Sequence, residues 1–218
     1  MLLSAASAQS FNIDLDIGSG SANIGAGAPS PSFGGAANSP GFWNDINGGD
    51  HGPRSLSGLD GSLTSAQISA SGGIGSYGGY NNPLNTGDYA LLLNDSADVG
   101  VTNFYHFSGF APGHYLLFTY AVKANAPNVA CAVTVPGADV PVQTVAGPMP
   151  GNAFILGVTH CLHDLILTGD SFEIDVSSPG PPTGQVNGFQ IVAVPEPTTV
   201  FVCLIGMVSL FRRRKRPM

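Results

Sequence analysis

The spacing of hydrophobic residues along the chain predicts short β-strands. Near the start, residues 11–17 (FNIDLDI) place an apolar side chain at every second position, with asparagine or aspartate between them. This period of two is typical of a strand with one apolar face and one face toward water. The sequence therefore predicts a half-buried strand at the beginning of the folded region.

The second half of the chain carries strand patterns more regularly. Residues 101–107 and 114–124 are rich in β-branched and aromatic residues, and the Pro112-Gly113 step between them suits a type II turn, so they predict a hairpin. More apolar runs follow at short, even spacings, as in a β-sandwich or barrel. These runs cover residues 129–135, 140–145, 153–159, 162–167, 172–176 and 187–194.

The first half is less regular and rich in glycine and serine. Residues 18–52 and 71–85 are predicted as loops, and residues 56–68 as one or two weak strands. Residues 89–93 are predicted as a short apolar strand and residues 94–98 as a polar turn. We therefore expect an all-β domain whose N-terminal part carries glycine-rich loops.

Composition and charge agree with this class. Only 10% of the residues are charged, and the 218 residues include 30 glycines and 17 prolines, which favours turns over surface helices. The net charge is −7, although five of the seven basic residues lie beyond Phe211. The rest of the chain is therefore more acidic still, and such a surface should repel nucleic acid.

The end of the chain has three parts in a fixed order. Pro195, Glu196 and Pro197 precede an uncharged run over residues 198–211, and a basic block follows, made of Arg212, Arg213, Arg214, Lys215 and Arg216. The prolines should end the preceding strand. The run predicts a single short transmembrane helix, since it would rise about 21 Å against a hydrocarbon core of about 30 Å. The basic block should remain cytoplasmic.

This order resembles the PEP-CTERM sorting domain of exported proteins in Gram-negative bacteria, which an integral-membrane exosortase is thought to recognise and remove. The resemblance covers residues 195–218. It implies that Pro195, Glu196 and Pro197 form the recognition triplet, residues 198–211 the membrane segment and the basic block a retention signal. It also implies an exosortase-type partner, a transient inner-membrane anchor and a final place on the outer surface or in the extracellular matrix. An ordinary stop-transfer anchor is the alternative.

The beginning of the chain has half of a secretory signal. Ala6-Ser7-Ala8 before Gln9 has the small-x-small form of a cleavage site, but no basic residue precedes it and the apolar stretch is short. Residues 1–10 are therefore predicted as the remnant of an N-terminal signal peptide that starts further upstream. A disordered N-terminal tail is the alternative.

A second resemblance covers residues 100–194. The motifs SGFAPGHY, VTVPGA and NGFQI are similar to those of jelly-roll modules in planctomycete-type PEP-CTERM proteins, which in turn resemble galactose-binding-like carbohydrate modules. The resemblance implies that residues 11–194 form a jelly-roll-like (galactose-binding-like) antiparallel β-sandwich. Because these motifs are turn signals, they imply a fold and identify no binding residue.

The cysteines leave two alternatives. Cys203 lies in the apolar run, whereas Cys131 and Cys161 lie in the part predicted to be exported. Two thiols in an oxidising compartment favour a disulfide. Two separate buried thiols on different strands are an equal alternative.

No motif for catalysis is present. The chain lacks the nucleophile elbow, the HExxH helix, the P-loop and the dinucleotide fingerprint. His160 and His163 would point to opposite faces of a strand, which argues against a zinc site. We therefore expect no enzyme and no resident cofactor other than calcium.

Calcium and sugar are the two ligands that the residue types favour. Hard oxygen ligands occur in three groups, namely Asp14 with Asp16, residues 94–98, and Asp45 with Asn47 and Asp50; solvated turn acids are the alternative.

Aromatic residues could form a sugar platform, and the candidates are Trp43, Tyr77 and Tyr80, although a lone tryptophan more often fills the edge of a core. Two hypotheses follow: a non-catalytic exported surface or matrix protein, and a carbohydrate-binding module for polysaccharide, with or without calcium.

Overall fold

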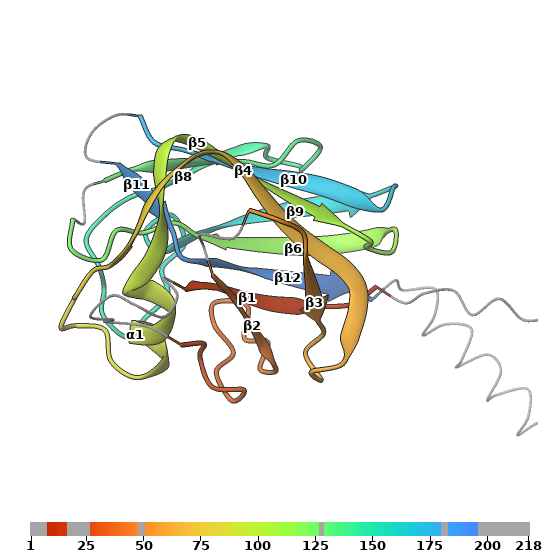
Figure 1. Ribbon diagram of the computed structural model, residues 1–218, viewed down its shortest axis with the longest axis horizontal. Helices are drawn as coiled ribbons and strands as arrows, with labels where there is room; N and C mark the ends of the chain where they lie inside the picture. Colours follow the sequence, from red (N-terminus) through yellow and green to blue (C-terminus); the bar gives the residue numbers. More distant parts are fainter. Residues whose placement is uncertain (1–7, 17–26, 48–50, 127–128, 180–182, 196–218) are drawn as a thin grey trace, which may run out of the picture.

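The structure is a computed structural model that describes residues 8–16, 27–47, 51–126, 129–179 and 183–195. Two β-sheets pack face to face in it (Figure 1). The five-stranded sheet contains β1 (Phe11–Asp16), β2 (Trp43–Asn47), β6 (Gly113–Tyr120), β9 (His160–Leu167) and β12 (Gly188–Val194). The seven-stranded sheet contains β3 (Arg54–Ser57), β4 (Leu63–Gly79), β5 (Asp95–Ser108), β7 (Cys131–Thr134), β8 (Val142–Val145), β10 (Ser171–Ser177) and β11 (Gly184–Val186).

The strand order defines a β-sandwich. The first sheet runs β2-β1-β12-β6-β9, and the second runs β3-β4-β5-β10-β7-β8 with β11 beside β5. Neighbouring strands are antiparallel except for β1 and β2, which are parallel. The predicted all-β sandwich is thus confirmed, and its finer jelly-roll-like class stays a prediction.

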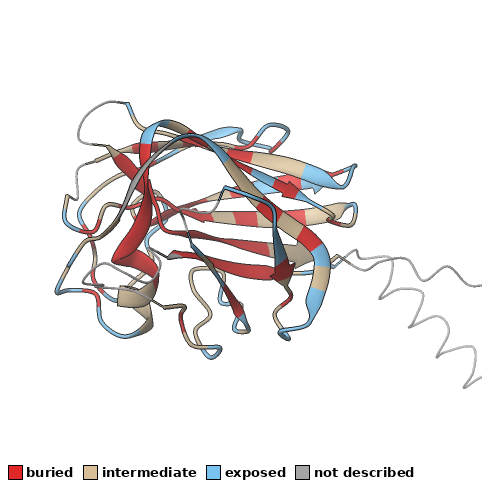
Figure 2. Cartoon of the chain, in the orientation of Figure 1, coloured by how far each residue is buried: buried red, intermediate tan, exposed pale blue. Residues whose placement is uncertain are grey.

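The core lies between the two sheets and is rich in aromatic rings. Phe107 is fully buried, and its ring centroid lies 4.8 Å from that of Phe172, 5.5 Å from that of Phe189 and 6.2 Å from that of Phe110. Figure 2 shows buried residues along the strands of both sheets. Because these rings come from both sheets and from the connection between them, their burial holds the two layers together.

The polar face of β1 is buried, contrary to the prediction that it faces water. Asn12 and Asp14 have no exposed surface. Asn12 Nδ2 donates to the Ser39 carbonyl (2.9 Å), and Gln190 Nε2 donates to Asn12 Oδ1 (2.8 Å). Asn12, together with Gln190, therefore ties residues 34–39 to this face of the sheet.

The predicted hairpin over residues 101–124 is also wrong. β5 belongs to the seven-stranded sheet and β6 to the five-stranded sheet, so the connection crosses the edge of the sandwich. Gly109 adopts a φ of 74°, and Phe110 directly after it is buried in the core. Burial of this ring between the sheets turns the chain from one layer to the other.

Several local predictions fail, most of them in the first half of the chain. The predicted strand at residues 89–93 is the helix α1 (Asp88–Leu93), whose Leu92 and Leu93 are fully buried. The predicted turn at 94–98 is the buried start of β5, and β4 continues through much of the predicted loop after residue 71. Residues 43–47 form β2 inside a predicted loop, while 153–159 make only an isolated bridge between Leu156 and His160.

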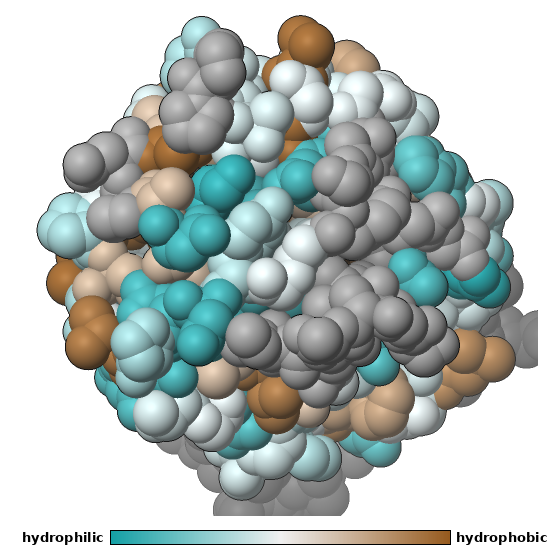
Figure 3. Space-filling model, turned by 60° about the vertical axis from the view of Figure 1, so that its left-hand side comes forward, coloured by the Kyte–Doolittle hydropathy of each residue, from teal (hydrophilic) through white to brown (hydrophobic). Residues whose placement is uncertain are grey.

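The surface around α1 mixes residue types. Figure 3 shows this face, where hydrophilic atoms lie among separate hydrophobic ones. Within the described ranges, no helix is long and apolar enough to cross a membrane. The predicted sorting and anchor segment beyond Pro195, with Glu196, Pro197 and the basic block, lies outside the described residues, as do residues 1–7 of the predicted signal remnant.

Candidate functional site

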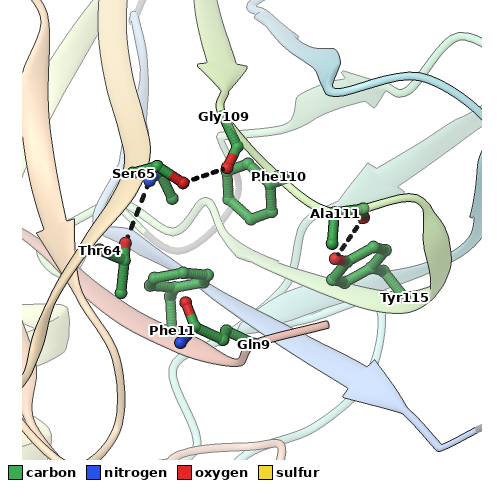
Figure 4. Close-up of a pocket in the computed structure, with 9 residues that line it drawn as sticks. Gln9, Phe11, Thr64, Ser65, Gly109, Phe110, Ala111 and Tyr115 are labelled. Carbon is green, nitrogen blue, oxygen red and sulfur yellow. Dashed lines mark hydrogen bonds between the residues drawn. The ribbon is translucent and has the colours of Figure 1, made fainter. Parts of the chain in front are cut away.

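A pocket opens at the edge of the sandwich where the chain crosses from β5 to β6. Its volume is about 250 Å³. Three segments line it: the start of β1 with the residues before it, the start of β4, and the β5–β6 connection with the start of β6 (Figure 4). The lining residues are Gln9, Phe11, Thr64, Ser65, Ala66, Gly109, Phe110, Ala111 and Tyr115. Among these described residues, none carries a charged side chain.

Hydroxyl groups on β4 form one side of the pocket. Thr64 Oγ1 donates to the Leu56 carbonyl (2.8 Å) and accepts from the backbone N–H of Ala66 (3.1 Å). Ser65 Oγ donates to the Gly109 carbonyl (3.0 Å). Because both hydroxyls are held by backbone groups, this side offers fixed, neutral hydrogen-bonding atoms.

Aromatic residues that are themselves largely buried line the opposite side, since Phe11 is 1%, Phe110 5% and Tyr115 0% exposed. The ring centroids of Phe11 and Phe110 lie 5.1 Å apart, and those of Phe110 and Tyr115 lie 6.0 Å apart. The Tyr115 hydroxyl donates to the Ala111 carbonyl (2.7 Å). Burial raises the pKa of Tyr115, so the phenol stays neutral. The pocket therefore combines an apolar wall with neutral donors and acceptors.

Trp43, one of the three residues of the predicted sugar platform, is buried. Trp43 is only 3% exposed, its Nε1 donates to the Phe33 carbonyl (3.0 Å), and the two rings lie 5.9 Å apart. The alternative, that this tryptophan fills the edge of the core, is correct. Tyr77 lies in β4 opposite Ala97, and its side chain is outside the described part of the structure.

Tyr80 is held by its neighbours instead of presenting an open ring. Its hydroxyl donates to Asp98, and Lys123 Nζ lies 5.0 Å from the ring centroid. Gln185 Nε2 also donates to Asp98 Oδ1 (2.7 Å). Burial, followed by the charge of Asp98, raises the pKa of Tyr80. One face of the ring is thus taken by a cation.

Cys131 and Cys161 are free, buried thiols on β7 and β9, which belong to different sheets. Burial raises the pKa of Cys131 to about 11 and that of Cys161 to about 12, so both stay protonated. The structure contains no Cys131–Cys161 bridge and agrees with the alternative of two separate buried thiols. Cys203 lies outside the described residues.

Of the acids predicted to bind calcium, Asp14 and Asp95 are not solvated turn residues, whereas Asp45 is exposed on β2. Asp14 and Asp95 have no exposed surface. Asp14 pairs with Gly188 in the β1–β12 ladder, and Asn187 Nδ2 donates to the Asp95 carbonyl (2.7 Å), so two of the three groups meet around residues 187–188. Asp50 and the side chain of Asp16 lie outside the part of the chain that the structure describes.

Other candidate metal ligands do not cluster. Asp45 and Asn47 lie on β2, and His160 is buried, which lowers its pKa to about 4. In the described ranges, no group of three or more His, Cys, Asp or Glu residues is placed to hold a metal ion. Calcium binding stays a prediction.

An acid pair on β10 has a titration that can be tested. His106 Nδ1 lies 2.6 Å from Glu173 Oε2. Burial, then the hydrogen bond and repulsion from Glu173, raise the pKa of Asp175 to about 6. The unfolded chain ionises Asp175 near pH 4, so this residue costs stability as the pH rises from about 4 to about 6.

Asp175→Asn is therefore expected to stabilise the protein by about 1 kcal/mol at pH 8, a figure that allows for solvent screening of this partly exposed group, and to change little at pH 4. Urea denaturation at the two pH values measures the difference. Glu173→Gln, which removes the repelling partner, should give part of the same gain at pH 8. An equal effect of Asp175→Asn at both pH values would contradict the assignment.

Comparisons with known proteins give no family. No family model matches the chain, and no curated protein matches its sequence. Among solved structures, a mutant of Bacteroides uniformis β-glucuronidase 2 is 14% identical with a TM-score of 0.47, covering 77% of this chain and 18% of that one. TmCBM61 in complex with β-1,4-galactotriose is 12% identical with a TM-score of 0.36, covering 59% of this chain and 88% of that one.

A third similar structure is Xyl-CBM35 in complex with a disaccharide that contains glucuronic acid. It is 13% identical with a TM-score of 0.29, covering 87% of this chain and 91% of the other. The chain matches only 16% and 18% of the length of two β-glucuronidases. At these scores the likenesses have no bearing on the site, and the chemistry of the pocket must be judged from its own residues.

None of the pocket residues was a predicted site residue. The SGFAPGHY motif contains Gly109, Phe110, Ala111 and Tyr115, but its sequence indicated only a turn. The remaining lining residues are small or uncharged and follow no known motif. The SGFAPGHY motif therefore predicts a feature of the fold and does not identify the pocket.

Proposed function

We propose that this β-sandwich is a non-catalytic carbohydrate-binding module that takes a neutral sugar in the pocket between β4 and the β5–β6 connection. The observation that carries the proposal is the lining itself, where neutral hydroxyl, amide and carbonyl groups lie beside the largely buried rings of Phe11, Phe110 and Tyr115. A sugar ring has apolar C–H faces and hydroxyls that both donate and accept. Fixed neutral polar groups over an apolar, largely buried aromatic base match that chemistry.

The absence of charge among the described lining residues favours a neutral ligand. A uronic acid or a phosphorylated sugar would bring an anion into a partly closed pocket without a cation to meet it, which is costly. The same residues include no carboxylate, whereas glycoside hydrolysis generally uses a pair of them. Binding without hydrolysis is the function that these groups support.

Filling the pocket tests this proposal. Ser65 is exposed, so Ser65→Trp should fold while its ring occupies the space next to Gly109. We expect the affinity for a neutral polysaccharide that the parent binds to fall by about tenfold or more, measured by affinity electrophoresis and calorimetry. Ser71→Trp, at an exposed site on the same strand, is the matched control and should bind as the parent does. Unchanged binding by Ser65→Trp would exclude this pocket.

We also propose that the chain is exported and sorted by its C-terminal segment, with an exosortase-type membrane enzyme as partner. Support comes from the order of Pro195-Glu196-Pro197, the uncharged run 198–211 and the basic block. Export would deliver the module to the cell surface or extracellular matrix, where polysaccharide is available. We expect the exported protein to lack residues 212–216 by mass spectrometry, and Glu196→Ala to retain them; a parent protein recovered outside the cell with this block intact would contradict the proposal.

A further inference from the structure

We propose that signal cleavage after Ala8 makes Gln9 the first residue of the mature protein, and that Gln9 then cyclises to a pyroglutamate that forms part of the pocket wall. The part of this inference that concerns ligand binding rests on the proposed carbohydrate-binding function. The part that concerns cleavage and cyclisation stands on the position and chemistry of Gln9 alone.

Gln9 is held at the pocket by the residues directly after it. Ser10 Oγ accepts a hydrogen bond from the backbone N–H of Ala193 on β12 (3.0 Å). Phe11 begins β1, is 1% exposed and packs its ring against Phe110 at 5.1 Å. Figure 4 shows the side chain of Gln9 beside Phe11. A new terminus at Gln9 therefore cannot leave the pocket unless these two anchors break.

The predicted cleavage site lies next to the same pocket. Ala6-Ser7-Ala8 has the small-x-small form that a signal peptidase accepts. A Cβ atom built on Gly113 would lie 3.5 Å from the Ala8 methyl group and 3.8 Å from Tyr115 Cε2, so Ala8 lies close to the Tyr115 side of the lining. Removal of Ala8 with the leader would open that side and leave Gln9 at the border.

Cyclisation of a terminal glutamine needs no other reactant. The free α-amino nitrogen attacks Cδ of its own side-chain amide and forms a C–N bond, the bond between Cδ and Nε2 breaks, and the old amide nitrogen leaves as ammonia with a proton from the amine. No group is oxidised or reduced. The product is a neutral five-membered lactam with one N–H donor and one carbonyl acceptor.

A lactam suits the pocket better than a free terminus. The α-ammonium group, with an ordinary pKa of about 7.7 to 8.0, would place a cation in a described lining that has no charged side chain. The ring removes this charge and the rotamer freedom of the glutamine chain, so its donor and acceptor are fixed before a ligand arrives. Cleavage would thereby complete the polar edge of the site.

The first test is the N-terminal peptide of the protein recovered after export, identified by mass spectrometry. We expect it to begin at residue 9, with a mass lower by one ammonia than that of the unmodified peptide. Gln9→Asn is the matched control, because its shorter side chain would have to close a strained four-membered ring, and it should keep a free amine. A start at another residue, or an unreacted Gln9, would overturn the inference.

Binding separates this inference from the proposed function. Against a neutral polysaccharide that the parent binds, Gln9→Asn should lose roughly 2- to 10-fold in affinity, as expected for one hydrogen bond, while Ser65→Trp should lose more. Equal affinity of Gln9→Asn and parent would overturn the role of the lactam in the wall. A parent with pyroglutamate and no affinity for any polysaccharide would overturn the proposed function and leave the processing of Gln9 supported.

Discussion

Replacement of Gln190 by leucine is expected to lower the free energy of unfolding by about 3 to 5 kcal/mol. Gln190 is fully buried on β12. Its Nε2 donates to Asn12 Oδ1 (2.8 Å) and to the Gly34 carbonyl (2.9 Å), and its Oε1 accepts from the N–H of Ala37 (3.0 Å) and the hydroxyl of Tyr120 (2.5 Å). Leucine has a similar volume and leaves all four of these groups without this partner.

Urea denaturation of parent and variant measures the loss. Gln67→Leu is the control, since Gln67 is a half-buried glutamine on β4 whose side chain makes no hydrogen bond within the described part of the chain. It should cost about 0.5 kcal/mol or less. If the two variants lost the same free energy, the buried network around Gln190 would not be what holds residues 34–39 on the sheet.

That network explains why the prediction that the polar face of β1 contacts water is wrong. Alternation of apolar and polar residues shows which face is apolar, and this part of the prediction is correct for Phe11, Ile13 and Leu15. The sequence pattern of a polar residue is the same whether its hydrogen-bond partner is water or another part of the protein. The partners of Asn12 lie 27 and 178 positions away, so no local pattern could reveal them.

The strands that the sequence predicted well are those in which the pattern is local and complete. β7, β9, β10 and β12 fall within or around the predicted runs, because alternating apolar residues on each bury toward the core. A short apolar run without alternation is ambiguous, and residues 89–93 form a helix because Leu92 and Leu93 then bury together near Trp43.

The sequence did not predict the crossing after β5 or the pocket beside it, and the reason is related. Turn residues predict that the chain changes direction, but they do not predict in which sheet the next strand lies. That choice depends on Phe110, whose ring packs against Phe11 and Phe172 from distant segments. The pocket arises from this same crossing, so neither its place nor its uncharged lining could be read from the aromatics and acids that the sequence singled out.

Gly109→Ala tests that crossing, and we expect it to lower the free energy of unfolding by about 2 to 4 kcal/mol. A Cβ atom at Gly109 would lie 2.2 Å from the Ser65 carbonyl oxygen, 2.9 Å from its carbonyl carbon and 3.3 Å from Ala66 Cα. These are backbone atoms of β4, so relief requires that strand to move. The φ of 74° adds strain for any residue with a Cβ.

Gly157→Ala separates the two causes. Gly157 has a φ of 79°, and a Cβ there would meet no described atom within 4 Å, so its substitution should cost about 1 kcal/mol from backbone strain alone. Because Ser65 donates to the Gly109 carbonyl across the pocket, the movement of β4 in Gly109→Ala should also weaken polysaccharide binding, whereas Gly157→Ala should bind as the parent does. Equal destabilisation of the two variants in urea would mean that β4 moves away from the added methyl group at no cost in free energy. The approach of β4 to the connection, and with it the shape of the pocket, would then not be fixed by glycine.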